Sequence, residues 1–139
     1  MSVGFSGSRL AAARLAAGLT QERLAQLVKS EQTRVSEWER GVMMPRPNVM
    51  PRLAAAVGMD ALEFLAADPE SPTLEDMRLA AGLTMQEVAE QLGVSVLRYR
   101  GVESGSTRRD PATQVVDQLA RIFAVPAVSV RRAIDTARL

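Results

Sequence analysis

The chain has 139 residues, of which 47% are apolar, and a formal net charge of +1 at pH 7. It contains no cysteine and no histidine, which excludes disulfides, thiol nucleophiles, zinc-finger ligand sets and the commonest general base. Because Ala and Leu dominate and β-branched runs are few, the composition favours helices over strands. We expect an all-α protein whose net charge does not by itself argue for a nucleic-acid partner.

Membrane and enzyme functions are also disfavoured. The sequence has no run of eighteen apolar residues, and Arg9 and Arg14 interrupt its Ala-rich start, so neither a membrane span nor a signal peptide is expected. Acidic residues fall mostly at expected helix caps and solvent faces rather than in pairs that could share a cleft. We predict a cytoplasmic protein that is not an enzyme, with no catalytic residues, no metal site and no cofactor.

The first half of the chain predicts five short helices. Residues 1–7 are small, include two glycines and show no periodicity, which predicts a loose N-terminal arm. Thr20, Asn48 and Asp60 stand where helices should begin, and such side chains cap helix N-termini; Asp60 would form a capping box with Glu63. Helices are expected over residues 9–17, 21–28, 32–40, 49–57 and 61–67.

A polar stretch bracketed by prolines, DPESP at residues 68–72, marks an expected domain boundary. After it the order of elements restarts, with a Thr84 and Glu87 capping box, Ser95 as the next cap, and Asp110 capping a helix that begins at Pro111. The predicted domains therefore cover residues 8–67 and 73–139. Helices of the second are expected over residues 74–81, 85–92, 96–104, 111–124 and 127–138.

The two halves are copies of one unit. Residues 14–41 align without a gap on residues 78–105, with eleven identical residues among twenty-eight and an unbroken RLAAGLT in both. In copy one, the stretch Thr20 to Gly41 predicts two helices that cross closely at Ala25 and are joined by a short turn, which is the pattern of a helix-turn-helix. The second turn has Gly93 where the first has Lys29, at a position that often requires a positive φ.

Both copies resemble the helix-turn-helix family of phage Cro and cI-type repressors, also called XRE. The recurring pattern of that family is an Arg-rich first helix, then LTQ, a small Ala, a turn, and a third helix ending in E-x-G, and the likeness covers nearly the whole chain after residue 8. It implies two compact five-helix domains in tandem. In the family the third helix enters the major groove of double-stranded DNA, which makes DNA the expected partner.

The resemblance also implies which residues of copy one meet DNA. The residue after the capping Thr often holds a phosphate, and here it is Gln21. Base edges are met by the first, second and sixth residues of the third helix, which are Gln32, Thr33 and Glu37. All can make suitable contacts, since Gln pairs with adenine, Thr offers a hydroxyl and a methyl group, and Glu accepts from the cytosine amino group.

Copy two lacks hydrogen-bonding side chains at the same positions, which hold Met85, Val96, Leu97 and Gly101. Three of these residues, Met85, Val96 and Leu97, predict an exposed apolar patch that could pair two chains. Residues suited to phosphate oxygens are nevertheless found in both copies. In copy one they are Arg34 and Ser36, and in copy two Arg98, Arg100, Arg108 and Arg109.

The arginine that begins the repeated heptapeptide, Arg14 or Arg78, has two interpretations. Each could reach a DNA phosphate, or each could form an ion pair with the acidic residue shared by both copies, Glu39 or Glu103. The residues leave this choice open.

Two functions follow from the sequence. The leading hypothesis is a sequence-specific DNA-binding transcription regulator, a repressor, whose first domain reads a half-site. We prefer a homodimer to a pseudo-dimer formed by the two copies of one chain, whose linker spans at most ~18 Å. The alternative is a protein-interaction module, such as an antitoxin, a co-regulator or an anti-repressor, which the near-zero charge and the apolar patch would favour.

Overall fold

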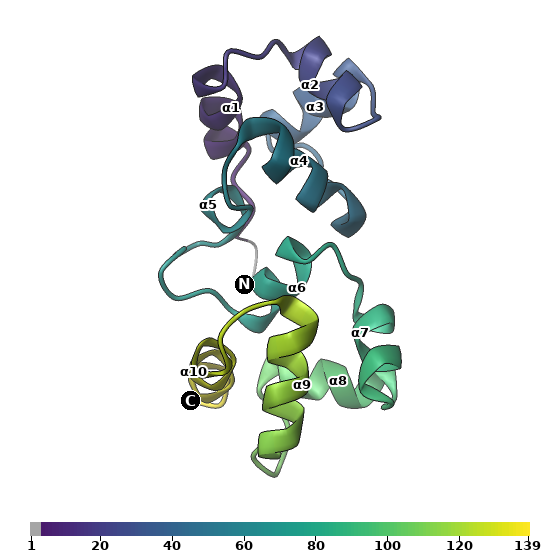
Figure 1. The fold of residues 1–139 in the computed structure, drawn as a ribbon, viewed down its shortest axis with the longest axis vertical. Coiled ribbons are helices and arrows are strands. Elements are labelled where there is room, and N and C mark those ends of the chain that lie inside the picture. Colours follow the sequence, from purple (N-terminus) through teal and green to yellow (C-terminus); the bar gives the residue numbers. More distant parts are fainter. Residues whose placement is uncertain (1–3) are drawn as a thin grey trace.

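The computed structural model describes residues 4–139, which form helices and connecting loops. Two groups of five α-helices lie one above the other along the long axis of the molecule (Figure 1). Each group has its own buried cluster of apolar side chains. The all-α class and the tandem arrangement expected from the repeat are confirmed.

Domain 1 is built around Trp38, Leu24, Leu53 and Phe64, all of them buried. The second and third helices form the most extensive helix–helix contact of this domain. Its elements are α1 (Gly7–Ala16), α2 (Gln21–Leu27), α3 (Gln32–Glu39), a 3₁₀ turn η1 (Pro47–Val49), α4 (Met50–Val57) and α5 (Leu62–Leu65).

The N-terminal residues that the structure describes are not a loose arm. Helix α1 begins at Gly7, because the Ser6 hydroxyl oxygen accepts a hydrogen bond of 3.1 Å from the Arg9 backbone N–H. Phe5 packs edge to face on Phe64 with the ring centroids 6.4 Å apart. The expectation of a loose arm over residues 1–7 is therefore wrong for residues 4–7, and residues 1–3 lie outside the described part of the chain.

Two expected caps in domain 1 are also corrected. Asn48 lies inside η1, and no side chain caps this turn or α4, because the chain enters the helix from Pro47, whose ring sets φ at the start. Asp60 accepts a hydrogen bond of 3.0 Å from the Leu62 N–H, but Glu63 does not complete a capping box, and α5 ends at Leu65. The cap at Thr20 is confirmed.

Domain 2 has the same order of five helices, and more of its predicted helix caps are present. Thr84 and Glu87 form the predicted capping box, and Ser95 caps the next helix. Asp110, however, does not cap a helix: α9 begins three residues later, and the Asp110 carboxylate faces Arg131 instead. The elements are α6 (Leu74–Ala80), α7 (Met85–Leu92), α8 (Val96–Ser104), α9 (Thr113–Phe123) and α10 (Ala127–Ala137).

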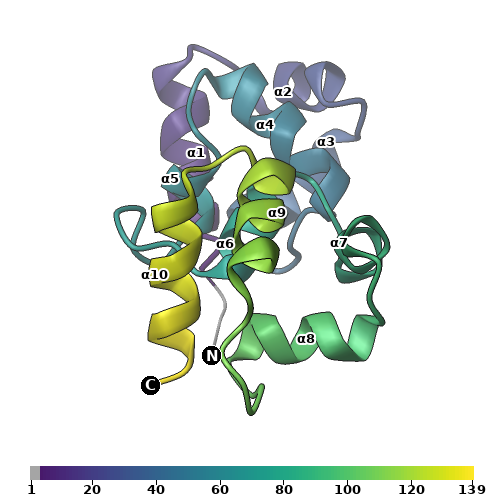
Figure 2. The ribbon, with the colours of Figure 1, turned by 60° about the horizontal axis from the view of Figure 1, so that its bottom comes forward.

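Helix α6 joins the two domains more tightly than a linker would. It lies between α4 and α5 on one side and α9 and α10 on the other (Figure 1). Leu79 belongs to the core of domain 1, whereas Leu74 and Met77 belong to the core of domain 2. In Figure 2, α6 is seen behind α9 and α10, with α5 above it. The stretch at residues 68–72 connects two domains that share a helix.

The turn between α2 and α3 holds a non-glycine residue at positive φ, which should lower the stability of domain 1. Lys29 has φ of 59°, and Gly93 at the same place in domain 2 has φ of 74°. A side chain at positive φ costs about 1 kcal/mol, so we expect Lys29→Gly to raise the free energy of unfolding of domain 1 by about 0.5–1 kcal/mol. Chemical denaturation followed by Trp38 fluorescence measures this. Lys29→Ala is the control, since it removes the charge but keeps the Cβ atom, and an equal gain there would refute the backbone explanation.

Candidate nucleic-acid interface

Helix α3 is held by its buried face. Val35 and Trp38 are 0% and 3% exposed, and Ala25 of α2 is buried where the two helices cross. The opposite face carries Gln32 and Thr33, both exposed and at the first turn of the helix. Positions one turn apart on a helix lie above one another, so this surface continues along α3 toward its second turn.

The second turn of α3 is less accessible. Ser36 and Glu37 are half-buried, and the Ser36 hydroxyl oxygen accepts a hydrogen bond of 3.2 Å from Arg40 Nε. The Glu37 backbone carbonyl accepts from the Val42 N–H at 3.0 Å, which ties the following loop to the helix. Arg34 is exposed beside this surface. The structure thus places Gln32, Thr33, Ser36 and Glu37 on one side of α3, with Arg34 at its edge.

Gln21 is turned toward the protein. Its side-chain amide donates a hydrogen bond of 3.0 Å to Glu39 Oε1, and the residue is half-buried. The expected phosphate contact would require this bond to be exchanged, or the backbone N–H at the start of α2 to serve instead.

The repeated arginine forms an ion pair in both domains. Arg14 donates to both carboxylate oxygens of Glu39, at 2.6 and 3.0 Å, and Arg78 donates to both of Glu103, at 2.8 and 3.1 Å. All four side chains are at most 12% exposed. Each guanidinium also donates to a backbone carbonyl of the loop after its helix. Of the two interpretations, the ion pair is the one that the structure shows.

The ion pairs perturb the groups around them. The hydrogen bond to Glu39 raises the pKa of the Arg14 guanidinium. Burial opposes the charge of Arg78, but the hydrogen bond and charge of Glu103 outweigh it and raise the pKa of Arg78. Burial, followed by the charge of Glu103, raises the pKa of Tyr99 far above its ordinary value. The Tyr99 hydroxyl is buried and has no hydrogen-bond partner among residues 4–139.

Comparison with protein families agrees with this architecture. Residues 7–66 match the model of one family described as a helix-turn-helix domain, and residues 74–129 match a second helix-turn-helix family. The chain is a tandem helix-turn-helix protein of the XRE type. No curated protein and no solved structure matches it. Domains of this type indicate a DNA-binding regulator and are typically non-enzymatic.

The reading face of domain 2 in this tandem helix-turn-helix protein differs from expectation. Met85 and Val96 are half-buried and pack against the core of domain 2, so they do not form an exposed patch with Leu97. Leu97 alone is prominent, with 74% of its surface exposed. The predicted apolar patch is therefore wrong, because two of its three side chains are part of the bundle. Arg98 and Arg100 are exposed on α8.

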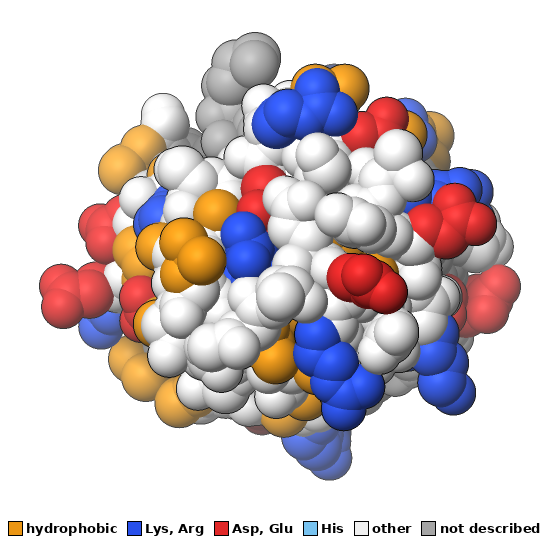
Figure 3. Space-filling view, turned by 90° about the horizontal axis from the view of Figure 1, so that it is seen from above, with side chains coloured by type: hydrophobic (Ala, Val, Ile, Leu, Met, Phe, Trp, Pro, Cys, Tyr) orange, Lys and Arg blue, Asp and Glu red, His pale blue; other side chains and the backbone are white. Residues whose placement is uncertain are grey.

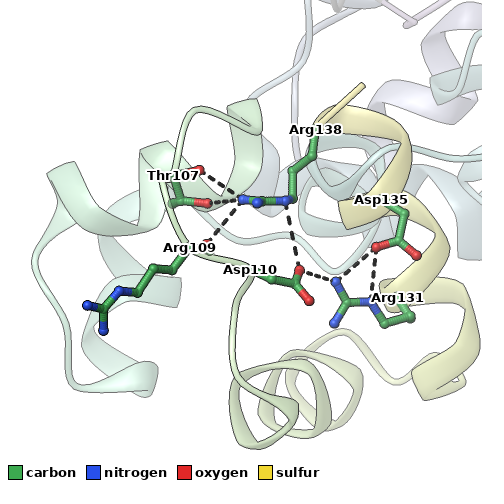
Figure 4. A network of polar contacts seen from close by, with 6 residues as sticks. All are labelled: Thr107, Arg109, Asp110, Arg131, Asp135 and Arg138. Carbon is green, nitrogen blue, oxygen red and sulfur yellow. Dashed lines mark hydrogen bonds and ion pairs between the residues drawn. The ribbon is translucent and has the colours of Figure 1, made fainter.

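The loop after α8 is tied to α10 by two arginines (Figure 4). Arg138 Nη1 donates to the Thr107 carbonyl and hydroxyl, both at 2.8 Å, and to the Arg109 carbonyl at 3.1 Å. Arg131 pairs with Asp110 and, at 2.9 Å, with Asp135. The Arg109 side chain extends away from this network, and Arg108 and Arg109 are both exposed. The sequence did not predict that these arginines stand on an anchored loop.

Two further basic residues of domain 1 were missed by sequence reasoning. Lys29 and Arg46 line the same hollow as Arg34, at the end of the helix-turn-helix where the loop before η1 returns. A basic residue in a turn and another in the VMMPRP loop carry no periodic signal, so only the fold brings them together. On the end of the molecule that carries domain 1, basic and acidic side chains are interspersed (Figure 3).

No helix in the described part of the chain could span a bilayer, since the longest, α9 and α10, have eleven residues each. Within the same residues, no group of acidic side chains is arranged to hold a metal ion.

Proposed function

We propose that the protein is a sequence-specific transcription repressor whose domain 1 reads the major groove with α3. The observation that carries this proposal is the difference between two otherwise equivalent surfaces. Helix α3 begins with two exposed side chains that can pair with base edges, Gln32 and Thr33, whereas α8 begins with Val96, half-buried, and Leu97. At these two positions, one copy can therefore discriminate bases by hydrogen bonds and the other cannot.

The contacts follow from the geometry of α3. Gln32 is suited to the N6 and N7 edge of adenine, and Thr33 to a hydroxyl contact or a thymine methyl group. Glu37, one turn further along, would accept from a cytosine amino group, and its half-buried position makes it the contact that demands the closest approach. We assign these three residues as base-reading.

Phosphate contacts would set the position of α3 in the groove. In domain 1 we propose Arg34 and Ser36, with Gln21 after release from Glu39. In domain 2 the exposed arginines could hold the DNA backbone without reading bases, since the charge interaction with phosphates is independent of sequence. These are Arg98, Arg100, Arg108 and Arg109.

A single reading helix per chain favours a homodimer on DNA. Helix-turn-helix proteins usually contact two half-sites about 34 Å apart, one per reading helix. Because α8 lacks hydrogen-bonding side chains at its start, one chain supplies one reading helix, and a second half-site requires a second chain. This argument replaces the apolar patch as the reason for preferring a dimer.

Removing the base-reading groups tests the proposal. Operators are first selected from a random duplex pool with the wild-type protein. For Gln32→Ala with Thr33→Ala, we expect the preference for the selected operator over random duplex to fall by about 30-fold or more, because two base contacts worth about 1–3 kcal/mol each are lost. Equilibrium titration at one fixed salt concentration measures the preference.

The matched control is Leu97→Ala, at the position of domain 2 that corresponds to Thr33. It should leave the preference unchanged. An unchanged preference in the domain 1 variant would refute α3 as the reading helix. A selected operator without two-fold symmetry would refute the homodimer while leaving the reading helix intact.

A further inference from the structure

We propose that domain 2 binds a small apolar carboxylate in a cavity beneath α8. The cavity has a volume of about 440 Å³ and lies between the end of α7, the inner side of α8, the loop that follows α8, and the start of α9. Ligand cavities in proteins are commonly about 300–1,000 Å³, with mostly apolar walls and a few polar groups at defined places. This cavity has both features.

The walls of the cavity are apolar. They are formed by Leu92, Val94, Val102 and Val115, together with the buried Tyr99. Val102 and Tyr99 are 9% and 0% exposed, so these surfaces belong to a packed domain rather than to a loose surface. An aliphatic or aromatic group placed here would lose contact with water on several sides.

The corresponding hollow of domain 1 is lined by different side chains. In the alignment of the two copies, Val94 and Val102 correspond to Ser30 and Trp38, which line the corresponding hollow of domain 1. A hydroxyl and an indole ring thus stand where domain 2 has two valines. The two substitutions make the site in domain 2 more apolar and remove the largest side chain from its wall.

The rim of the cavity is cationic. Arg98, Arg108 and Arg109 line it, and all three are exposed. The acidic residue of the rim, Asp110, is already paired with Arg131 of α10. The ion pairs formed within residues 4–139 use other arginines, so these three guanidinium groups are available to an anion.

Walls and rim together specify the ligand class. The apolar walls select an aliphatic or aromatic body, and guanidinium groups bind carboxylates through paired, charge-assisted hydrogen bonds. The loop that carries Arg108 and Arg109 is held by Arg138, which limits the entropy lost when an anion binds. The same arginines are our candidates for phosphate contacts, so a bound carboxylate would compete with DNA for them.

Binding is tested on the full chain in the absence of DNA, so that the result does not depend on the proposed repressor function. Octanoate is titrated into the protein by calorimetry, and shifts of backbone amide signals locate the site. We expect saturable binding with the largest shifts in α8 and residues 105–112. Octan-1-ol, which has the same chain and no charge, should bind at least about tenfold more weakly.

Two variants separate the walls from the rim. Val102→Trp introduces the residue that domain 1 carries at the corresponding place, and should weaken octanoate and octan-1-ol together, because it changes a wall that both ligands contact. Arg108→Gln with Arg109→Gln leaves the walls unchanged and should weaken octanoate about tenfold or more while leaving octan-1-ol unaffected. Arg132→Gln, an exposed arginine of α10 outside the cavity, is the matched control.

Several results would overturn the proposal. They are no saturable binding of octanoate, equal affinity for octanoate and octan-1-ol, or signal shifts elsewhere in the chain. The arginine variants keep the test decisive if Val102→Trp fails to fold, because their side chains are exposed. Equal weakening by Arg132→Gln would show attraction by general positive charge and would likewise exclude a built site.

Discussion

Replacing Arg78 by methionine is expected to destabilise domain 2 by about 3–5 kcal/mol, because it leaves the carboxylate of Glu103 buried without its partner. Arg78 and Glu103 side chains are 7% and 6% exposed, and two hydrogen bonds of about 3 Å join them. The guanidinium also supports the Leu83 carbonyl at 3.0 Å. Chemical denaturation followed by circular dichroism, with the fluorescence of Tyr99 as a local probe, measures the loss.

A double variant separates the cost of the unpaired Glu103 carboxylate from the cost of lost side-chain packing. In Arg78→Met with Glu103→Leu, both charges of this pair are removed, so most of the stability should return even though the ion pair is absent. Arg132→Met, on the exposed face of α10, should change stability by less than about 0.5 kcal/mol. If the double variant is no more stable than Arg78→Met, the unpaired carboxylate is not the cause.

Replacing the next residue, Leu79, by alanine should instead destabilise domain 1. Leu79 is 9% exposed and packs in the core of domain 1, although it lies in the first helix of domain 2. Truncating a buried leucine costs about 2–4 kcal/mol. The single tryptophan, Trp38, is in domain 1 and the single tyrosine, Tyr99, is in domain 2, so the two domains have separate fluorescence probes. The Trp38 transition should move to lower denaturant concentration.

The repeat supplies the matched control for this variant. Leu15 is the equivalent residue of domain 1, in the same RLAAGLT segment, but 65% of its surface is exposed. Leu15→Ala should therefore change the Trp38 transition by less than about 0.5 kcal/mol. A loss confined to the Tyr99 signal in Leu79→Ala would contradict the assignment of α6 to both domains.

Helix starts were predicted well from local sequence where the capping side chain bonds to the first turn of its own helix. Thr20, Thr84 and Ser95 cap their helices as expected, because each bonds to a backbone N–H only three residues away. Asn48 and Asp110 have the same chemistry but do not cap helices. At Asp110 the competing partners are Arg131 of α10 and Arg138 just after it, more than twenty residues distant, and local sequence carries no information about them.

The sequence identified the exposed hydrogen-bonding residues of the candidate interface, but not how the side chains around them pack. Alignment of the two copies identified Gln32 and Thr33 as the hydrogen-bonding groups that domain 2 lacks, and the structure shows both of them exposed. That this face reads DNA stays a proposal. The bond from Gln21 to Glu39, the burial of Met85 and Val96, and the cavity beneath α8 depend on how side chains pack between helices. Sequence spacing does not report such packing.

The amino-acid sequence by itself determined the helices, their order and their duplication, because hydrophobic period, caps and turn glycines act over a few residues. It even repeated the segment RLAAGLT without change. Only the tertiary structure decided that Leu15 faces water while Leu79 fills the core of the other domain. The difference arises because burial depends on which surface folds against a helix, and domain 1 lies against α6 whereas α1 has no such neighbour over Leu15 within the described residues.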